Sequence, residues 1–269
     1  MDRTKDQWGE RFATCVNGVN IFAMGADYIP EDHLLGRVTP ETRDKEFGGW
    51  YSGITSDGKI LPNKQCYAHA FVILAASSAI LAGKSEAKKL LQDALDVYDL
   101  RFWNEEEGLS CDTWNTEFTK LDSYRGINAN MHTVEAFLAA ADVTGNQIYR
   151  IRAGRIIRHV IAWAGENDWR IPEHFTSDWI ADLECNKDHP ADQFKPYGAT
   201  PGHGIEWARL ILQWAVSTYQ DDENNQLLST VWPGKSDLYH AFQATLIPYN
   251  RVDLSIACAI KEKKDGGLE

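Results

Sequence analysis

The apolar positions of this chain recur with the spacing of α-helices, and the helices come in pairs. An alanine-rich helical pattern at 65–83 is followed by a more amphipathic one at 85–103, with apolar residues at i, i+3, i+4 and i+7. Segments 130–145 and 146–164 repeat this layout. The first helix of each pair ends at a glycine, Gly83 or Gly145, where a left-handed residue commonly closes a helix. The pattern therefore predicts αα-hairpins.

The same layout extends beyond these two pairs. The segment "VNIFAMG" ends at Gly25, and Gly25, Gly83 and Gly145 follow one another at intervals of 58 and 62 residues. A further helix from about Gly202 to Tyr219 begins a fourth unit, while "GGWYSGI", "GLSCDTW" and "DWRIPEHF" are candidates for short ribbons between hairpins. We predict an all-α protein forming a single domain over 1–269, with a frayed tail from about residue 261.

Composition narrows the classes of function. The formal net charge is −12, which argues against binding to a phosphate backbone, because nucleic-acid-binding proteins concentrate lysine and arginine. The chain has no apolar run of the ~18 residues that a membrane span needs and no export signal. Its five cysteines are scattered without CxxC spacing, which indicates reduced thiols. We expect a cytoplasmic protein without nucleic-acid or membrane partners.

Histidines beside aromatic and polar residues are the first candidates for chemistry: His132, His174, His203 and His240. An imidazole titrates near neutrality and can therefore exchange protons at working pH. In "HTVE" and "HGIE" a glutamate, Glu135 or Glu206, follows its histidine at i+3 and shares its helix face. Each carboxylate is expected to orient a nearby imidazole, although a buried His–Glu contact without chemistry is an alternative. Dinuclear metal bundles use the reverse order, Glu-x-x-His, and we predict no metal.

Other catalytic motifs give little support. GxSxG, GxGxxG and GxxxxGK[ST] are absent from the sequence, which removes the hydrolase-elbow, dinucleotide and P-loop interpretations. A carboxylate pair for glycoside cleavage is a weaker alternative, because loop acids are usually solvated or cap helices. Its candidates are Asp112, Asp122, Asp178 and Asp182.

Several motifs occur together and in order: "NKQCYAHAF", "FWNEEEGL", "DSYRGINANMHTVEAF", "YGATPGHGIEWARL" and "WPGKSDLYH". In these motifs the chain resembles the N-acylglucosamine 2-epimerase superfamily, and within it the mannose and sulfoquinovose aldose–ketose isomerases. The likeness runs from about Gly48 to Tyr219 and resumes from Trp232 to about Pro248. It covers most of the chain.

The resemblance implies an (α/α)6 barrel of αα-hairpins. Six hairpins of about 60 residues would need roughly 360 residues, and we therefore expect an incomplete barrel of about four. The resemblance also implies a monosaccharide substrate, no cofactor, and catalysis by His203 and His240 with Glu206 beside His203. The sugar-binding positions that it implies are Tyr67, Asn128, His132 and Phe194, with Arg11 as a looser match. Arg125 is a candidate to hold a sulfonated or phosphorylated sugar, although an ion-paired surface or loop residue is the preferred interpretation.

For such an enzyme the implied reaction is an aldose–ketose isomerisation through an enediol. One histidine transfers the proton between C2 and C1, for which His240 is favoured, and the other moves protons at the ring oxygens. Two alternatives stay open: a 2-epimerase, with one imidazole on each face of C2, and a shortened sugar-binding remnant without activity. A homo-oligomer in which two chains complete each other's open edge is also possible.

Overall fold

The computed structural model describes residues 42–55, 57–192 and 195–219, together with the backbone of four short strands between residues 5 and 21. The tertiary contacts divide the chain into two units, 1–38 and 39–269. We describe each unit by itself.

The first unit contains two antiparallel β-ribbons. Strand β1 (Lys5–Asp6) pairs with β2 (Gly9–Glu10), and β3 (Thr14–Val16) pairs with β4 (Val19–Ile21). The helical interpretation of "VNIFAMG" is therefore wrong for Val19–Ile21. The reason is local, since an Asn-Gly dipeptide separates the paired residues Val16 and Val19, and this dipeptide strongly favours a two-residue hairpin loop.

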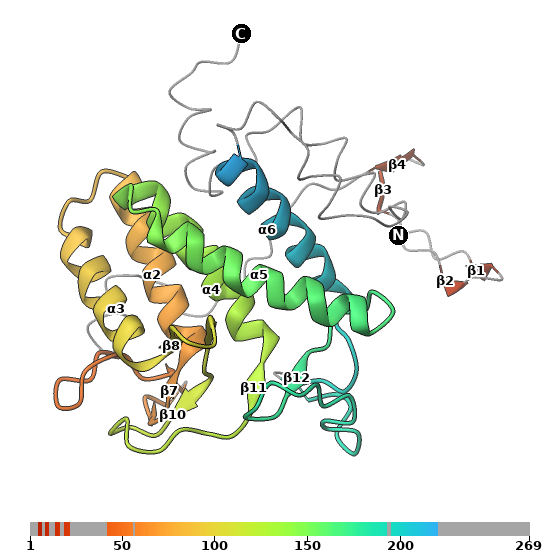
Figure 1. Ribbon diagram of the computed structural model, residues 1–269, viewed down its shortest axis with the longest axis horizontal. Coiled ribbons are helices and arrows are strands. Elements are labelled where there is room, and N and C mark those ends of the chain that lie inside the picture. Colours follow the sequence, from red (N-terminus) through yellow and green to blue (C-terminus); the bar gives the residue numbers. More distant parts are fainter. Residues whose placement is uncertain are drawn as a thin grey trace, which may run out of the picture. The chain divides into compact units, whose positions relative to one another are not determined.

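The second unit contains the predicted helices (Figure 1). They are α2 (Cys66–Leu81), α3 (Ala87–Arg101), α4 (Ile127–Thr144), α5 (Ile148–Glu166) and α6 (Pro201–Tyr219). Gly83 and Gly145 have φ values of +82° and +72°, which confirms their predicted left-handed conformation beyond the helix ends. The hairpins α2–α3 and α4–α5 are thus as the sequence indicated, and α6 is the additional helix.

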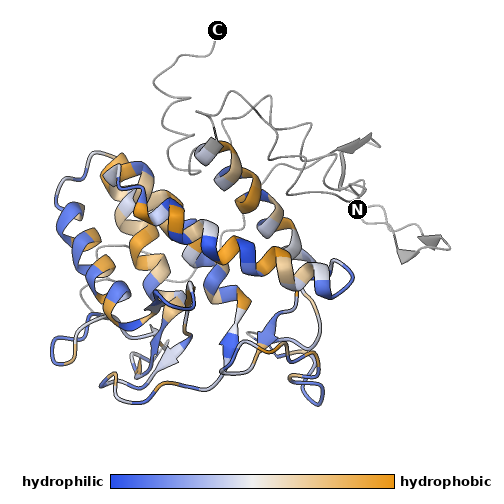
Figure 2. Ribbon diagram, in the orientation of Figure 1, coloured by the Kyte–Doolittle hydropathy of each residue, from blue (hydrophilic) through white to orange (hydrophobic). Residues whose placement is uncertain are grey.

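Helix α4 is the centre of this unit. It packs against α2, α5 and α6, while α3 covers α2 and α5 also contacts α6. Apolar residues run along α2 and α4, whereas α3 and α5 show one apolar and one polar side (Figure 2). The approach of α5 to α6 depends on a glycine, because a Cβ at Gly154 would lie 2.5 Å from the Trp214 ring. The indole of Trp214 donates a hydrogen bond to the carbonyl of Arg150 at 3.0 Å.

Short antiparallel ribbons gather at one end of the helices (Figure 1). They pair β5 (Gly53–Ile54) with β6 (Ile60–Leu61), β7 (Lys64–Gln65) with β10 (Thr113–Trp114), β8 (Trp103–Asn104) with β9 (Leu109–Ser110), and β11 (Arg125–Gly126) with β12 (His174–Phe175). All three predicted ribbon segments contribute strands. Strands β7 and β11 lead directly into α2 and α4, so the ribbons fix where these helices begin. Within the described residues, no helix combines the length and apolar character that a membrane crossing requires.

Candidate active site

The first turns of α2, α4 and α6 carry most of the described candidate residues. Tyr67 is the second residue of α2, Asn128 the second of α4 and His203 the third of α6. The start of α4 is held from outside the helix, since the backbone N–H of Gly126 donates to Asp112 Oδ2 at 2.7 Å. Helix N-termini carry partial positive charge, and the backbone N–H groups at the starts of these helices can therefore stabilise negative charge on a ligand.

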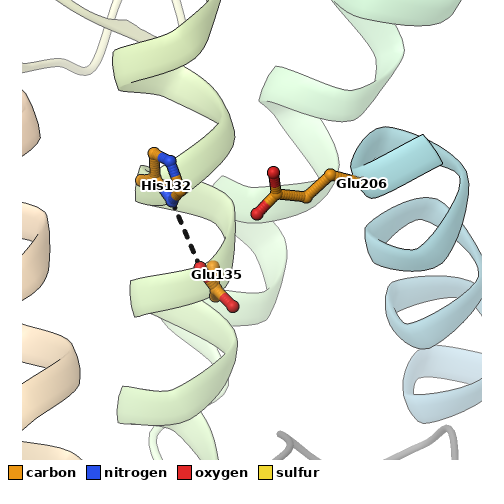
Figure 3. Close-up of side chains that lie close together, drawn as sticks. All are labelled: His132, Glu135 and Glu206. Carbon is orange, nitrogen blue, oxygen red and sulfur yellow. Dashed lines mark hydrogen bonds and ion pairs between the residues drawn. The ribbon is translucent and has the colours of Figure 1, made fainter. Parts of the chain in front are cut away.

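Helices α4 and α6 bring three predicted residues together (Figure 3). His132 Nδ1 lies 3.2 Å from Glu135 Oε2 on the same helix, which confirms the pairing expected from "HTVE". Glu206 reaches toward both from α6, and one ligand atom from each of the three residues lies within 4.8 Å of the others. The side chains come from helices that begin more than seventy residues apart in the sequence, so their meeting follows from the packing of α4 against α6.

Aromatic rings border this cluster from the side of α2. The Tyr67 ring stands edge-on to the His132 imidazole with centroids 5.0 Å apart, and the Phe71 ring lies 4.8 Å from both. Tyr67 and Phe71 are 39% and 40% exposed, which leaves apolar surface beside the polar groups. Sugar sites combine such faces with hydrogen-bonding groups. The sequence analysis missed Phe71, although its i+4 spacing from Tyr67 places it on the same helix face.

His203 binds a carboxylate that the sequence analysis did not predict. Its Nδ1 lies 2.9 Å from Oε2 of Glu173, a residue with 5% of its side chain exposed. Within the described part of the chain, Glu173 and not Glu206 is the carboxylate hydrogen-bonded to His203. Glu206 instead points toward His132 and Glu135. The i+3 spacing predicts Glu206 as the partner of His203, but Glu173 approaches from the loop before β12, thirty residues earlier in the chain. In the motif "PEHF" the sequence analysis considered only His174.

The charges at this end of the unit shift two pKa values upward. The hydrogen bond to Glu173 raises the pKa of His203 above its usual value, with the nearby charges of Glu173 and Glu206 adding to it against the effect of burial. Burial, followed by the charges of Glu206 and Glu135, raises the pKa of the Tyr67 phenol. Glu206 therefore lies within electrostatic reach of both His203 and Tyr67, and it connects the His132 cluster with the His203–Glu173 pair.

The donor set His132, Glu135 and Glu206 is of a kind that could hold a divalent cation. One member is already engaged, however, because Glu135 Oε1 accepts a hydrogen bond from the Arg209 guanidinium at 2.9 Å while Oε2 faces His132. A metal ion at Glu135 would have to compete with this fixed positive charge. The same arrangement suits a neutral polyol, which needs donors and acceptors side by side.

Asn128 carries an unused acceptor. Its Oδ1 is buried and has no hydrogen-bond partner among the described residues. Buried polar atoms are normally paired, and an orphan acceptor on the first turn of α4 is therefore available to a ligand hydroxyl.

Other candidates have structural partners. His174 uses both ring nitrogens, with Nδ1 2.7 Å from the Tyr124 hydroxyl and Nε2 2.7 Å from the Pro196 carbonyl oxygen. The expectation of an ion-paired surface or loop residue is wrong for Arg125, which is buried in β11 and donates to the backbone carbonyls of Asp122 and Tyr124. Its contacts are structural. Burial raises the pKa of Asp112 to about 7, but this carboxylate supports the start of α4.

Three predicted residues fall outside the described part of the chain: His240, Arg11 and Phe194. Their roles stay predictions from the sequence.

Comparison with known proteins gives consistent findings. The family described as N-acylglucosamine 2-epimerase (GlcNAc 2-epimerase) matches residues 32–228. A D-mannose isomerase from Pseudomonas cannabina pv. alisalensis is 46% identical over 72% of this chain and 47% of its own length. A D-mannose isomerase from Thermobifida fusca is 45% identical over 67% of this chain and 45% of its own length.

Solved structures agree with the sequence relatives. A crystal structure of a D-mannose isomerase superposes with a TM-score of 0.63 at 32% identity, covering 71% of this chain and 48% of that one. The cellobiose 2-epimerase of Spirochaeta thermophila, at 18% identity, matches with a TM-score of 0.60 over 79% of this chain and 51% of its own. These likenesses confirm the predicted barrel-type arrangement of αα-hairpins. The chain spans about half the length of the curated relatives that it matches.

Proposed function

Because the chain belongs to the N-acylglucosamine 2-epimerase family, we propose that it is a sugar isomerase interconverting an aldose and its ketose, of the mannose–fructose type. Similarity to two D-mannose isomerases at 46% and 45% identity supports the reaction and the substrate. The single structural observation that carries the proposal is the His203–Glu173 hydrogen bond of 2.9 Å at the start of α6. It gives an imidazole of raised basicity at the end of the unit where Tyr67, Asn128 and His132 also lie.

The proposed chemistry follows from the acidity of the C2 proton next to the open-chain carbonyl. A base removes this proton, the electron pair forms the C1–C2 double bond, and the carbonyl oxygen takes up a proton to give an enediol. Return of a proton to C1 and loss of the C2 hydroxyl proton then give the ketose. We assign the C2–C1 transfer to His240 and the proton movements at the ring oxygens to His203, although the two roles can be exchanged.

The other described candidates would bind the sugar. Tyr67 and Phe71 offer ring faces, Asn128 offers its free Oδ1, and His132 offers an imidazole fixed by Glu135. Developing negative charge on the enediolate oxygens is stabilised by donors already in place and by the helix N-termini. Arg11 and Phe194 would complete the binding residues, as the family resemblance implies.

Incubating the purified protein with mannose and identifying the product tests this proposal. Fructose is the expected product, and His203→Ala and His240→Ala should each lower its rate by about 100-fold or more. Glucose as the product would instead establish the 2-epimerase alternative, which the family name favours. Equal rates for the parent and both variants would establish a sugar-binding remnant, which the half-length match to the relatives favours. A cytoplasmic location and a homo-oligomer stay predictions from the sequence.

A further inference from the structure

Glu173 contacts the beginnings of two helices that carry candidate residues. Its backbone carbonyl accepts the N–H of Ile127, the first residue of α4, at 3.0 Å. Its Oε1 accepts the backbone N–H of Thr200, just before α6, at 3.0 Å, and its Oε2 lies 2.9 Å from His203 Nδ1. The residue is 6% exposed. Glu173 therefore links the start of α4, which carries Asn128 and His132, to the start of α6, which carries His203.

The hydrogen bonds of Glu173 also determine which nitrogen of His203 carries the proton. A carboxylate only accepts hydrogen bonds, and therefore the Nδ1 atom of His203 must be the donor. In the neutral imidazole the lone pair then lies on Nε2, for which the described residues provide no hydrogen-bond partner. The Nε2 atom is thus the one left to exchange protons with a substrate.

We propose that Glu173 is a positioning residue of the isomerase: it fixes the Nδ1–H tautomer of His203, leaves Nε2 as the proton acceptor, and stabilises the imidazolium once it forms. The inference rests on the proposed function for its effect on turnover, whereas the tautomer and basicity of His203 are independent of it. Other ionisable groups facing this pair are Glu206, which acts on His203 through space, and Tyr124, which is affected by the charge of Glu173.

The variant Glu173→Gln tests the assignment, because it keeps the size of the side chain and removes its charge. An amide can donate to Nδ1 as well as accept from it, so the fixed tautomer should be lost. In ¹⁵N NMR spectra of the whole chain, the parent should show His203 protonated at Nδ1 with a pKa above the ordinary value. In the variant the Nδ1–H tautomer should no longer be fixed, and the pKa should fall. Glu184→Gln is the matched control, because Glu184 pairs with Lys187 in an exposed position.

Turnover provides the second measurement. We expect Glu173→Gln to lower kcat by about 100-fold, with a smaller change in KM, and to move the acidic limb of the pH profile to lower pH. Glu173→Asp retains the charge and should recover part of kcat, which a purely structural role does not predict. If Glu173→Gln unfolds the protein, Glu173→Asp in the same NMR titration decides the matter: Nδ1 must stay protonated, and a preference for the Nε2–H tautomer overturns the inference.

The outcomes separate the two proposals. A parent without activity on mannose, but with His203 fixed as the Nδ1–H tautomer by Glu173, rejects the proposed function and retains the positioning role. An active parent whose Glu173→Gln variant keeps the same kcat, tautomer and His203 pKa rejects the positioning role alone.

Discussion

Two histidines of this protein, His69 and His203, occupy opposite kinds of environment. His69 is fully buried on α2, where its Nε2 accepts the N–H of Trp50 at 3.0 Å and its Nδ1 donates to the Gln65 carbonyl at 2.8 Å. Burial lowers its pKa to about 4. His203 has 24% of its side chain exposed and a carboxylate at Nδ1, and its pKa is raised. Burial keeps the His69 ring neutral even though its Nδ1 donates to a carbonyl, whereas a carboxylate at Nδ1 raises the basicity of His203.

The surroundings of His69 form what we call the buried corner, made of Asp44, Gly49, Trp50, Lys64 and His69. Lys64 has no exposed side chain, and its ammonium donates to Asp44 Oδ2 at 2.7 Å and to the Gly48 carbonyl at 2.8 Å. Every charge there has a partner already in place. At His203, by contrast, the described residues leave Nε2 unpaired. The comparison separates groups that stabilise the fold from groups that can react.

The largest effect should come from breaking the buried ion pair. The variant Asp44→Ala leaves the Lys64 ammonium buried without its counter-charge, and we expect a loss of about 3–5 kcal/mol in the free energy of unfolding. Urea denaturation measures it. Asp57→Ala is the control, because Asp57 pairs with Lys59 in an exposed position and should change stability by less than about 0.5 kcal/mol. Equal losses in both variants would contradict the distinction between the buried corner and the surface.

Protonation of His69 should give the next largest effect. A histidine whose folded pKa is lowered opposes protonation, so its contribution is complete above the unfolded value of about 6.5 and is lost as pH falls toward about 4. This difference corresponds to about 3 kcal/mol. Carboxylates titrate over the same range, and the measurement is therefore the excess loss of stability in the parent over His69→Gln between pH 7 and pH 4. Parallel curves for the two proteins would show that His69 does not carry this dependence.

A neighbouring pair of glycines tests how tightly the buried corner is packed. Gly48 and Gly49 both have positive φ, +78° and +67°, so alanine is strained at either position. A Cβ at Gly49 would also lie 2.7 Å from His69 Nε2, whereas one at Gly48 meets nothing within 4 Å. We expect Gly48→Ala to cost about 1 kcal/mol and Gly49→Ala to cost about 1–3 kcal/mol more. Thermal denaturation of the two variants measures the difference. Equal Tm values would contradict the close approach of Gly49 to His69.

The sequence predicted what depends on local periodicity. The hairpin helices and the closing glycines follow from residues that are near neighbours, and the His132–Glu135 pair needs only one helical turn. The ribbons β5–β6 and β8–β9 are also local, whereas β7–β10 and β11–β12 pair strands about fifty residues apart in the sequence. The ribbon at Val16 and Val19 is local too, because its Asn-Gly loop determines it, whereas the repeat interval predicts a helix there.

The site required information that no single helix contains. Glu173 reaches His203 because β12 pairs with β11 and thereby places the residue before β12 beside the start of α6. Glu206 turns toward His132 and Glu135 because α4 packs against α6. A helix-face rule applied to "HGIE" could not anticipate either contact, since it considers only the chain within a few residues of the histidine.

The smallest expected effect is a change in the pKa of His203. It distinguishes Glu206, the carboxylate predicted from the sequence, from Glu173, the one found in the structure. Both Glu173 and Glu206 raise the pKa of His203, but only Glu173 does so through a hydrogen bond, while Glu206 acts through space. We expect Glu206→Gln to lower the pKa of His203 by less than Glu173→Gln does, because charge interactions without a hydrogen bond weaken with distance and solvent screening. Glu206→Gln should leave the pKa of His69 unchanged, since His69 is buried beside Lys64 and not beside Glu206.

NMR titration of the histidine ring protons measures the pKa of His203 in the parent, in Glu173→Gln and in Glu206→Gln. The same spectra give the pKa of His69. Added salt sharpens the test, because it should reduce the difference between parent and Glu206→Gln more than the difference between parent and Glu173→Gln. If Glu206→Gln instead produced the larger fall, the i+3 pairing read from "HGIE" would be the dominant interaction in solution. The basicity of His203 would then depend on Glu206 of its own helix rather than on Glu173, which lies just before β12.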